Sequence, residues 1–142
     1  MATLTATFDT DGTWSFNPGN LVLTASDTIT LALVAQSGTI AFLDGNPLSW
    51  FNPNDSNQPI DKPGNFSYPS NVTGSSLLIT DTVGILTSPQ AFTFRINALY
   101  QSSPTDNGVV VQSPDPTIIN VDTGGVLPII PASAQGTTAV AH

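Results

Sequence analysis

The chain has 142 residues, enough for one domain with a single hydrophobic core. Its formal net charge is -8, with Lys62 and Arg95 as the only basic residues, so it is not expected to bind the phosphate backbone of nucleic acids or an anionic membrane. The chain contains no cysteine, which excludes disulfides, thiolate metal sites and cysteine nucleophiles.

The composition favours strands over helices. All ten acidic residues are aspartate, which prefers turns, and glutamate, a good helix former, is absent. Charged residues make up only 8% of the chain, so solubility depends on Thr, Ser, Asn and Gln. Such a surface is compatible with the cell surface or the extracellular space, although residues 1–11 lack the basic and apolar regions of a signal peptide. The compartment is left open.

The first part of the chain alternates apolar and polar residues with the period of a strand. Residues 2–8 place Leu4 and Phe8 on one face and threonines on the other. A turn signal at Asp11-Gly12 follows, so the pattern predicts a hairpin over residues 2–16. Further strands are expected at residues 21–25, 27–34 and 39–43.

The clearest strand is expected at residues 91–100, where Phe92, Phe94 and Ile96 share a face and are predicted to lie in the core. Other strands are expected at residues 76–82, 108–112 and 117–121. About nine or ten short strands separated by turn signals indicate an all-β fold, an antiparallel β-sandwich of the cupredoxin-like or immunoglobulin-like type.

Two segments break the alternation. Residues 44–74 are rich in Asn, Pro, Ser and Gly and are expected to form a long loop, and long loops are often functional. Residues 123–142 contain Gly124-Gly125 and several small residues, typical of a linker. The sequence therefore predicts a sandwich domain over residues 1–122 and a flexible, linker-like tail over residues 123–142.

No set of catalytic residues is evident, and the chain is not expected to be an enzyme. The single histidine is His142, the last residue, so a Ser-His-Asp triad is not expected. Asp9 and Asp11 match the opening of a calcium loop, but the later ligands of that loop are missing, and a hairpin turn is the favoured interpretation. No other metal site and no cofactor are expected.

The long loop contains the candidate ligand-binding residues. Aromatic rings together with amide and carboxylate groups are typical of a sugar or peptide site. The candidates are Trp50, Phe51, Asp55, Asn57 and Tyr68. The alternative, favoured here, is that Trp50 and Phe51 close the end of the sandwich as buried residues.

Three stretches give the chain a resemblance to cupredoxin-like domains. Residues 14–31 (WSFNPGNLVLTASDTITL) resemble the opening of such domains, and residues 92–96 (FTFRI) resemble a late strand of the same fold. Residues 113–120 (SPDPTIIN) are similar to a stretch in small uncharacterised bacterial proteins of this kind. The copper ligands, a Cys, two His and a Met, have no counterpart, so the resemblance implies a copper-less relative without electron transfer.

The leading hypothesis is a non-enzymatic β-sandwich that acts through its surface, by self-association into a homo-oligomer or by binding a protein partner. Exposed strand edges with almost no basic residues to protect them favour association. The alternative hypothesis is a lectin-like carbohydrate-binding module that uses residues 44–74, with or without calcium.

Overall fold

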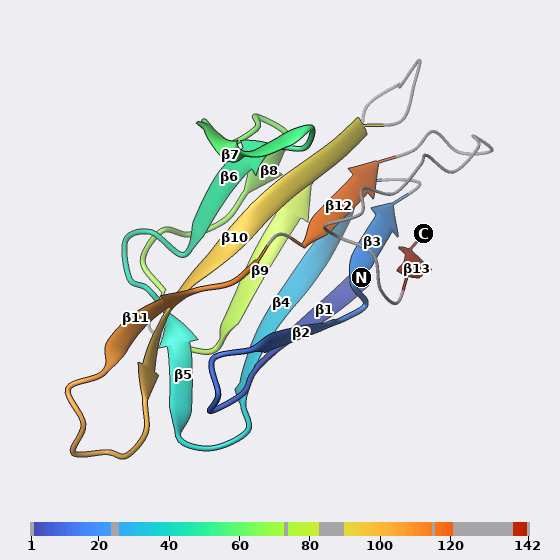
Figure 1. Ribbon diagram of the computed structural model, residues 1–142. Coiled ribbons are helices and arrows are strands. Elements are labelled where there is room, and N and C mark those ends of the chain that lie inside the picture. The colour runs from blue at the N-terminus through green and yellow to red at the C-terminus, as the bar shows by residue number, and fades with distance from the viewer. Residues whose placement is uncertain are drawn as a thin grey trace.

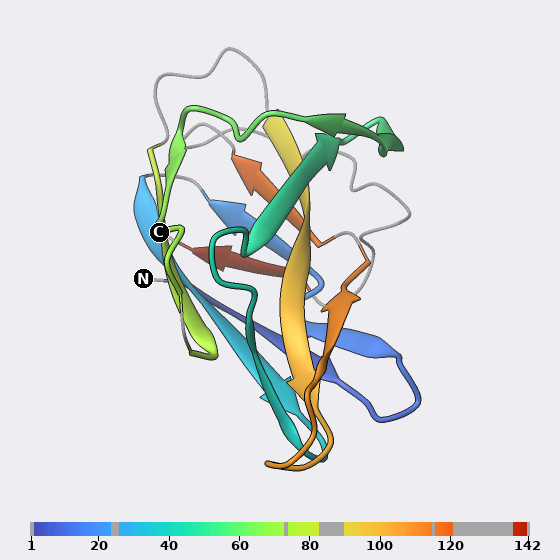
Figure 2. The same ribbon diagram turned by 90° about the vertical axis from the view of Figure 1, so that its left-hand side faces the viewer.

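The computed structural model describes residues 2–23, 26–72, 74–82, 90–114, 116–120 and 138–141. Every regular element in these residues is a strand, which confirms the predicted all-β class. The strands form two sheets that pack face to face as the layers of a sandwich (Figure 1, Figure 2).

The first sheet has five strands. Alternate residues of its strands face the second sheet, and Leu4, Leu31 and Ile79 are almost fully buried there. Its first two strands pair antiparallel and confirm the hairpin predicted over residues 2–16. In spatial order, the sheet contains β2 (Trp14–Asn17), β1 (Ala2–Phe8), β4 (Asp27–Ala35), β9 (Ser76–Asp81) and β8 (Phe66–Ser67).

The second sheet has eight strands arranged around one long central strand. The first half of this strand, β10, pairs with β12 and β6, and the second half pairs with β11 and β5. In spatial order, the sheet contains β13 (Thr138–Ala141), β3 (Asn20–Leu23), β12 (Thr117–Asn120), β10 (Gln90–Gln101), β6 (Leu48–Asn52) and β7 (Asp55–Ile60), with β5 (Thr39–Phe42) and β11 (Val109–Gln112) beside the end of β10.

The core lies between the sheets and contains the residues that the alternation of β10 predicts. Phe94 and Ile96 are buried, and Phe92 packs against the core while partly exposed. Ala98, two residues further on the same face, is also fully buried. Both sheets are mixed, because β1 pairs parallel with β4 and β12 pairs parallel with β3.

Two expectations from the sequence need correction, the long loop over residues 44–74 and the number of strands. Residues 44–74 are not a loop without regular structure: β6, β7 and β8 lie within them, which brings the strands to thirteen rather than nine or ten among the described residues. The sequence pattern did not predict β7 because it is an edge strand without an apolar face. Of the predicted tail, residues 123–137 and 142 lie outside the described residues, while β13 pairs parallel with β3.

No helix capable of crossing a membrane occurs in the described ranges.

Candidate functional site

A groove of about 480 Å³ opens between β6, the end of β7 and the segment after β8. Its volume falls within the range typical of small-molecule sites. Pro47, Leu48 and Trp50 are buried members of its lining. The polar side chains along it are Asn46, Ser49, Asp61, Lys62, Tyr68 and Ser70.

Trp50 is a core residue at the base of this groove. Its side chain is 4% exposed. Its ring centroid lies 4.6 Å from that of Phe66, 5.5 Å from that of Phe94 and 6.4 Å from that of Tyr68. Because other rings surround it, Trp50 has no open face for a ligand, and the interpretation of Trp50 as a buried plug is supported.

Tyr68 is half-buried, and its hydroxyl is held by Trp50. Trp50 Nε1 donates a hydrogen bond of 2.8 Å to Tyr68 Oη. Burial raises the pKa of Tyr68 above its ordinary value, and the hydrogen bond from Trp50 opposes this shift only in part. Tyr68 is therefore protonated at neutral pH, and its own proton remains available to an acceptor in the groove.

Lys62 is a further donor in the groove. Lys62 Nζ donates a hydrogen bond of 2.6 Å to the Phe66 carbonyl oxygen and lies 5.9 Å from the centroid of the Tyr68 ring. Ser49 also belongs to the lining, but its Oγ lies on the Phe51 side of β6, where it accepts a hydrogen bond of 2.8 Å from Asn97 Nδ2. The groove is thus rich in hydrogen-bond donors, with the Asp61 carboxylate as an acceptor beside them.

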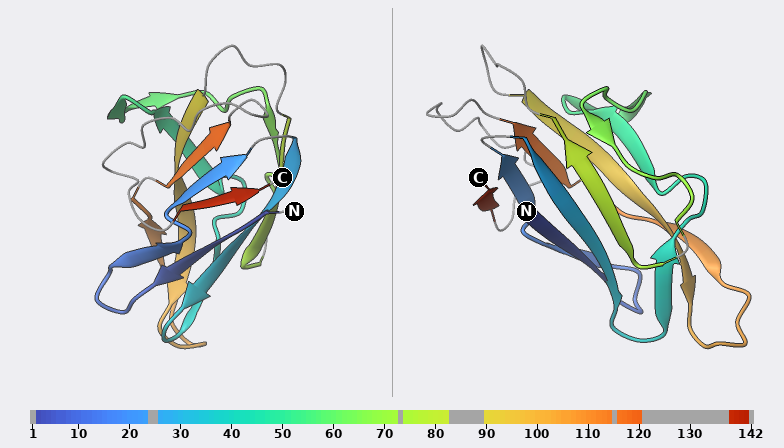
Figure 3. Two further views of the ribbon diagram at one scale, coloured as in Figure 1. Left: turned by 90° about the vertical axis from the view of Figure 1, so that its right-hand side faces the viewer. Right: turned by 180° about the vertical axis from the view of Figure 1, so that it is seen from behind.

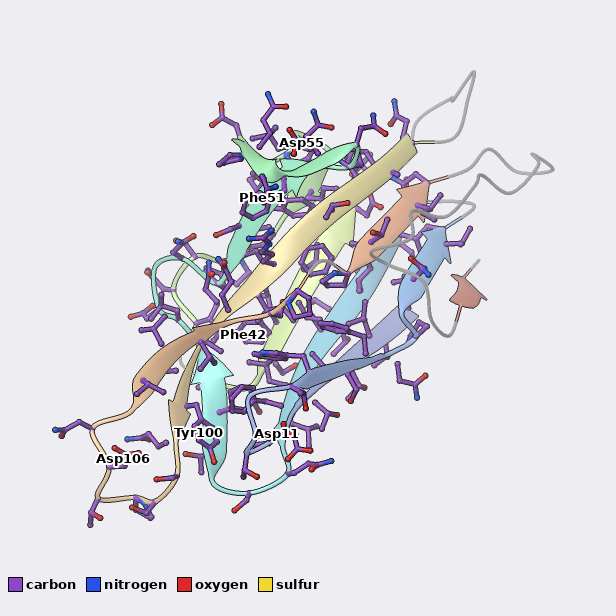
Figure 4. The ribbon with its side chains drawn as sticks, in the orientation of Figure 1. Asp11, Phe42, Phe51, Asp55, Tyr100 and Asp106 are labelled. Atoms are coloured by element: carbon purple, nitrogen blue, oxygen red, sulfur yellow. The ribbon has the colours of Figure 1, made fainter. Side chains whose placement is uncertain are left out.

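The other three predicted ligand residues lie outside the groove. Phe51 follows Trp50 in β6 and faces the opposite side of the sheet, where Arg95 Cζ lies 4.2 Å from its ring centroid. Asp55 Oδ1 accepts a hydrogen bond of 3.1 Å from the backbone N–H of Asn57, so this carboxylate is engaged locally within β7. Phe51 and Asp55 lie at the β6–β7 hairpin (Figure 4). Only Trp50 and Tyr68 of the predicted set line the groove.

The two candidate calcium residues belong to the β1–β2 turn, at the other end of the molecule from Asp55 (Figure 4). Asp11 Oδ1 accepts hydrogen bonds from the hydroxyl of Thr13, at 2.6 Å, and from its backbone N–H, at 2.9 Å. Both bonds lower the pKa of Asp11, and the bond from the Thr13 hydroxyl has the larger effect. The Asp9 carbonyl accepts a hydrogen bond of 2.9 Å from the N–H of Gly12. This geometry is that of the favoured hairpin turn.

A buried carboxyl that sequence reasoning missed joins the two sheets. Asp81 is fully buried, and its Oδ1 accepts hydrogen bonds from Asn65 Nδ2 at 2.8 Å and Asn120 Nδ2 at 3.1 Å. Loss of hydration raises the pKa of Asp81, and the two amide donors oppose this shift. The signal was present in the sequence, because Asp81 continues the inward-facing series of Leu77 and Ile79 in β9.

β11 forms an exposed edge of the second sheet. It pairs with β10, and no other strand of the described residues pairs with it. Val109 and Val110 are 57% and 63% exposed, while Val111 packs against the core. The strand contains neither charge nor proline. Figure 3 shows that the β10–β11 hairpin projects at one end of the molecule.

No protein-family model matches the chain, and no curated protein matches it either. The resemblance to cupredoxin-like domains therefore stays a prediction. The groove and the free edge of β11 are the two surface features through which a ligand or a partner could bind.

Proposed function

We propose that this chain is a non-enzymatic assembly subunit whose copies pair through the free edge of β11. The observation that supports it is the combination of two exposed valines with a strand edge that no other strand of the described residues pairs with. A row of unpaired backbone N–H and C=O groups is a template for another strand. Natural proteins usually protect such an edge with Lys, Pro or a bulge, and Val109–Gln112 has no Lys and no Pro.

The neighbouring edge strand of the same sheet differs in this respect. β7 carries Asp55 and Pro59, a charge and a residue without a backbone donor, which both discourage pairing. β11 is thus the less protected of these two edges. Two copies of β11 related by a twofold axis would pair antiparallel and join their second sheets into one continuous sheet.

The balance of forces makes this association weak. Each copy carries a net charge of -8, and this charge repels a second copy at low salt. A pairing strand of four residues supplies few hydrogen bonds and little buried area, as in a transient interface. We therefore expect association at high protein concentration or where many copies are held together.

The test replaces Val110 with lysine, which places a charge on the free edge. Leu78→Lys is the matched control: it adds the same charge at an exposed leucine in β9, a strand of the first sheet that does not pair with β11. Sedimentation velocity across micromolar to millimolar concentration should show association of the wild type and Leu78→Lys, and a monomer for Val110→Lys. A wild type that stays monomeric throughout, or a Val110→Lys variant that associates like the wild type, contradicts the proposal.

A further inference from the structure

We infer that the groove beside Tyr68 binds a neutral, hydroxyl-rich ligand, a sugar, through hydrogen bonds along its walls rather than through stacking on aromatic rings. This inference is independent of assembly through β11, because the groove and that edge lie on different strands. It also differs from the site that the sequence suggested, since Phe51, Asp55 and Asn57 take no part in it.

The charges of the groove favour a neutral ligand. Lys62 and Asp61 are adjacent members of its lining, and together they contribute no net charge. An anionic ligand is repelled by the net charge of -8 and by Asp61. A cationic ligand is attracted by the net charge but is repelled by the Lys62 ammonium inside the groove. A neutral ligand avoids both costs.

The hydrogen-bonding groups match hydroxyls. The proton of Tyr68 is available because its oxygen already accepts a hydrogen bond from Trp50. Lys62 retains further N–H donors beyond the one that it gives to Phe66. A sugar hydroxyl can accept from one of these donors and donate to the Asp61 carboxylate, so neighbouring hydroxyls satisfy donors and acceptor together.

The aromatic rings do not offer a stacking platform. The Tyr68 ring has Trp50 stacked near it at 6.4 Å and Lys62 Nζ at 5.9 Å from its centroid. Trp50 itself is buried. The open apolar surface of the groove is instead the side chain of Ile60, which is 40% exposed and can contact the C–H groups of a sugar.

The donors are also held in place before a ligand arrives. The hydrogen bond from Trp50 fixes the Tyr68 oxygen, and the bond to the Phe66 carbonyl fixes the Lys62 ammonium. Groups that are already ordered lose less conformational entropy on binding. This arrangement compensates in part for the absence of stacking.

The test uses the two tryptophan indole N–H signals of the ¹⁵N-labelled full chain, assigned with a Trp14→Phe variant. The neutral probes are glucose, galactose, mannose and N-acetylglucosamine, and the charged probes are glucuronate and glucosamine. Because Trp50 Nε1 donates to Tyr68 Oη, a ligand that accepts the Tyr68 proton should shift the Trp50 signal. We expect at least one neutral probe to shift the Trp50 signal saturably without moving that of Trp14.

Three variants make the assignment specific. Tyr68→Phe keeps the ring and removes the hydroxyl, and it should weaken binding about three- to tenfold, while Lys62→Met should weaken it about tenfold or more. Tyr100→Phe is the matched control, since its hydroxyl donates to the Ser37 carbonyl away from the groove, and it should bind like the wild type. The inference is wrong if no neutral probe shifts the Trp50 signal, if Tyr68→Phe binds with wild-type affinity, or if a charged probe binds more tightly than every neutral one. The titration is repeated with Val110→Lys, which is expected to be monomeric. Wild-type affinity of this variant for the sugar would show that binding at the groove does not depend on assembly through β11.

Discussion

Asn120 Nδ2 lies 3.1 Å from Asp81 Oδ1 and donates a hydrogen bond that links the second sheet to the first. The other polar side-chain atom of each residue, Asp81 Oδ2 and Asn120 Oδ1, is buried without a partner among the described residues. Across the β4–β9 pair, Asp81 also lies opposite Asp27, another carboxyl. Burial favours the neutral form of Asp81, and the hydrogen bonds from Asn65 and Asn120 oppose it only in part. A proton on Asp81 Oδ2 would remove the cost of burying an unpaired charge at this position.

The stability contributed by Asp81 should therefore fall as pH rises. Its pKa is higher in the folded chain than the ordinary value of 3.8, so the folded state holds the proton more tightly than the unfolded state. The contribution is complete below that ordinary value and is lost as pH rises through the folded pKa. Asp11 and Asp106 have lowered pKa values and contribute the opposite slope, so the measurement is the difference between wild type and Asp81→Asn.

Asp81→Asn supplies a permanent donor where the proton would be. In urea unfolding from pH 3 to 7, we expect the free energy of unfolding of this variant to increase relative to that of the wild type as pH rises. At pH 7 the variant should be the more stable protein. Asp81→Ala is the control, because it leaves the buried Asn120 amide donor unpaired, at a cost of about 1–3 kcal/mol, and also removes the partner of the partly exposed Asn65. A difference between wild type and Asp81→Asn that does not change with pH would show that Asp81 does not titrate in this way.

Truncation of Phe94 to alanine should destabilise the fold. Phe94 is 1% exposed and its ring contacts that of Trp50, so the variant leaves a cavity between the sheets. We expect a loss of about 3–5 kcal/mol in the free energy of unfolding. Leu78→Ala, at a leucine that is 50% exposed, should change it by about 0.5 kcal/mol or less. Equal effects of the two substitutions would place Phe94 outside the core.

These residues also show how far the sequence predicts the structure. Alternation identified the buried face of β10 because Phe94 and Ile96 recur with the period of a strand. It failed for β7, where residues 55–58 are all polar and pairing with β6 alone defines the strand. The groove could not be foreseen either. Ser49 and Lys62 are ordinary polar residues in the sequence, and only the pairing of β6 with β7 places them around one cavity.

Trp50→Ala should lower the free energy of unfolding of the chain. With the ring surrounded by Phe66, Phe94 and Tyr68, its loss should cost about 3–5 kcal/mol of unfolding free energy. Trp50→Phe keeps an aromatic ring but removes the donor to Tyr68, so it should cost less. Thermal unfolding distinguishes the outcomes: an unchanged melting temperature for Trp50→Ala would contradict its role as a core residue.

A cysteine on β11 should cross-link two copies of the chain. The sequence has no cysteine, so Val110→Cys would carry the single thiol of the protein. Antiparallel pairing of two β11 strands brings their residues within the reach of a disulfide. Under mild oxidation, non-reducing electrophoresis should show a covalent dimer for Val110→Cys well above the amount for Leu78→Cys. Equal dimer yields would mean that random collision, rather than pairing of β11, forms the bond.

Salt should strengthen the association of the wild-type chain. Two copies of net charge -8 repel each other over the Debye length, which falls from about 30 Å at 0.01 M to about 10 Å at 0.1 M ionic strength. Hydrogen bonding between strand edges and contact between valines are short-range and much less affected by salt. The dissociation constant from sedimentation should therefore decrease as NaCl rises from 0.01 to 0.1 M. Val110→Lys should remain monomeric at both concentrations, because the lysine disrupts the edge itself rather than the long-range repulsion. Association that weakens as salt increases would instead point to an interface held by opposite charges, which an uncharged β11 edge cannot provide.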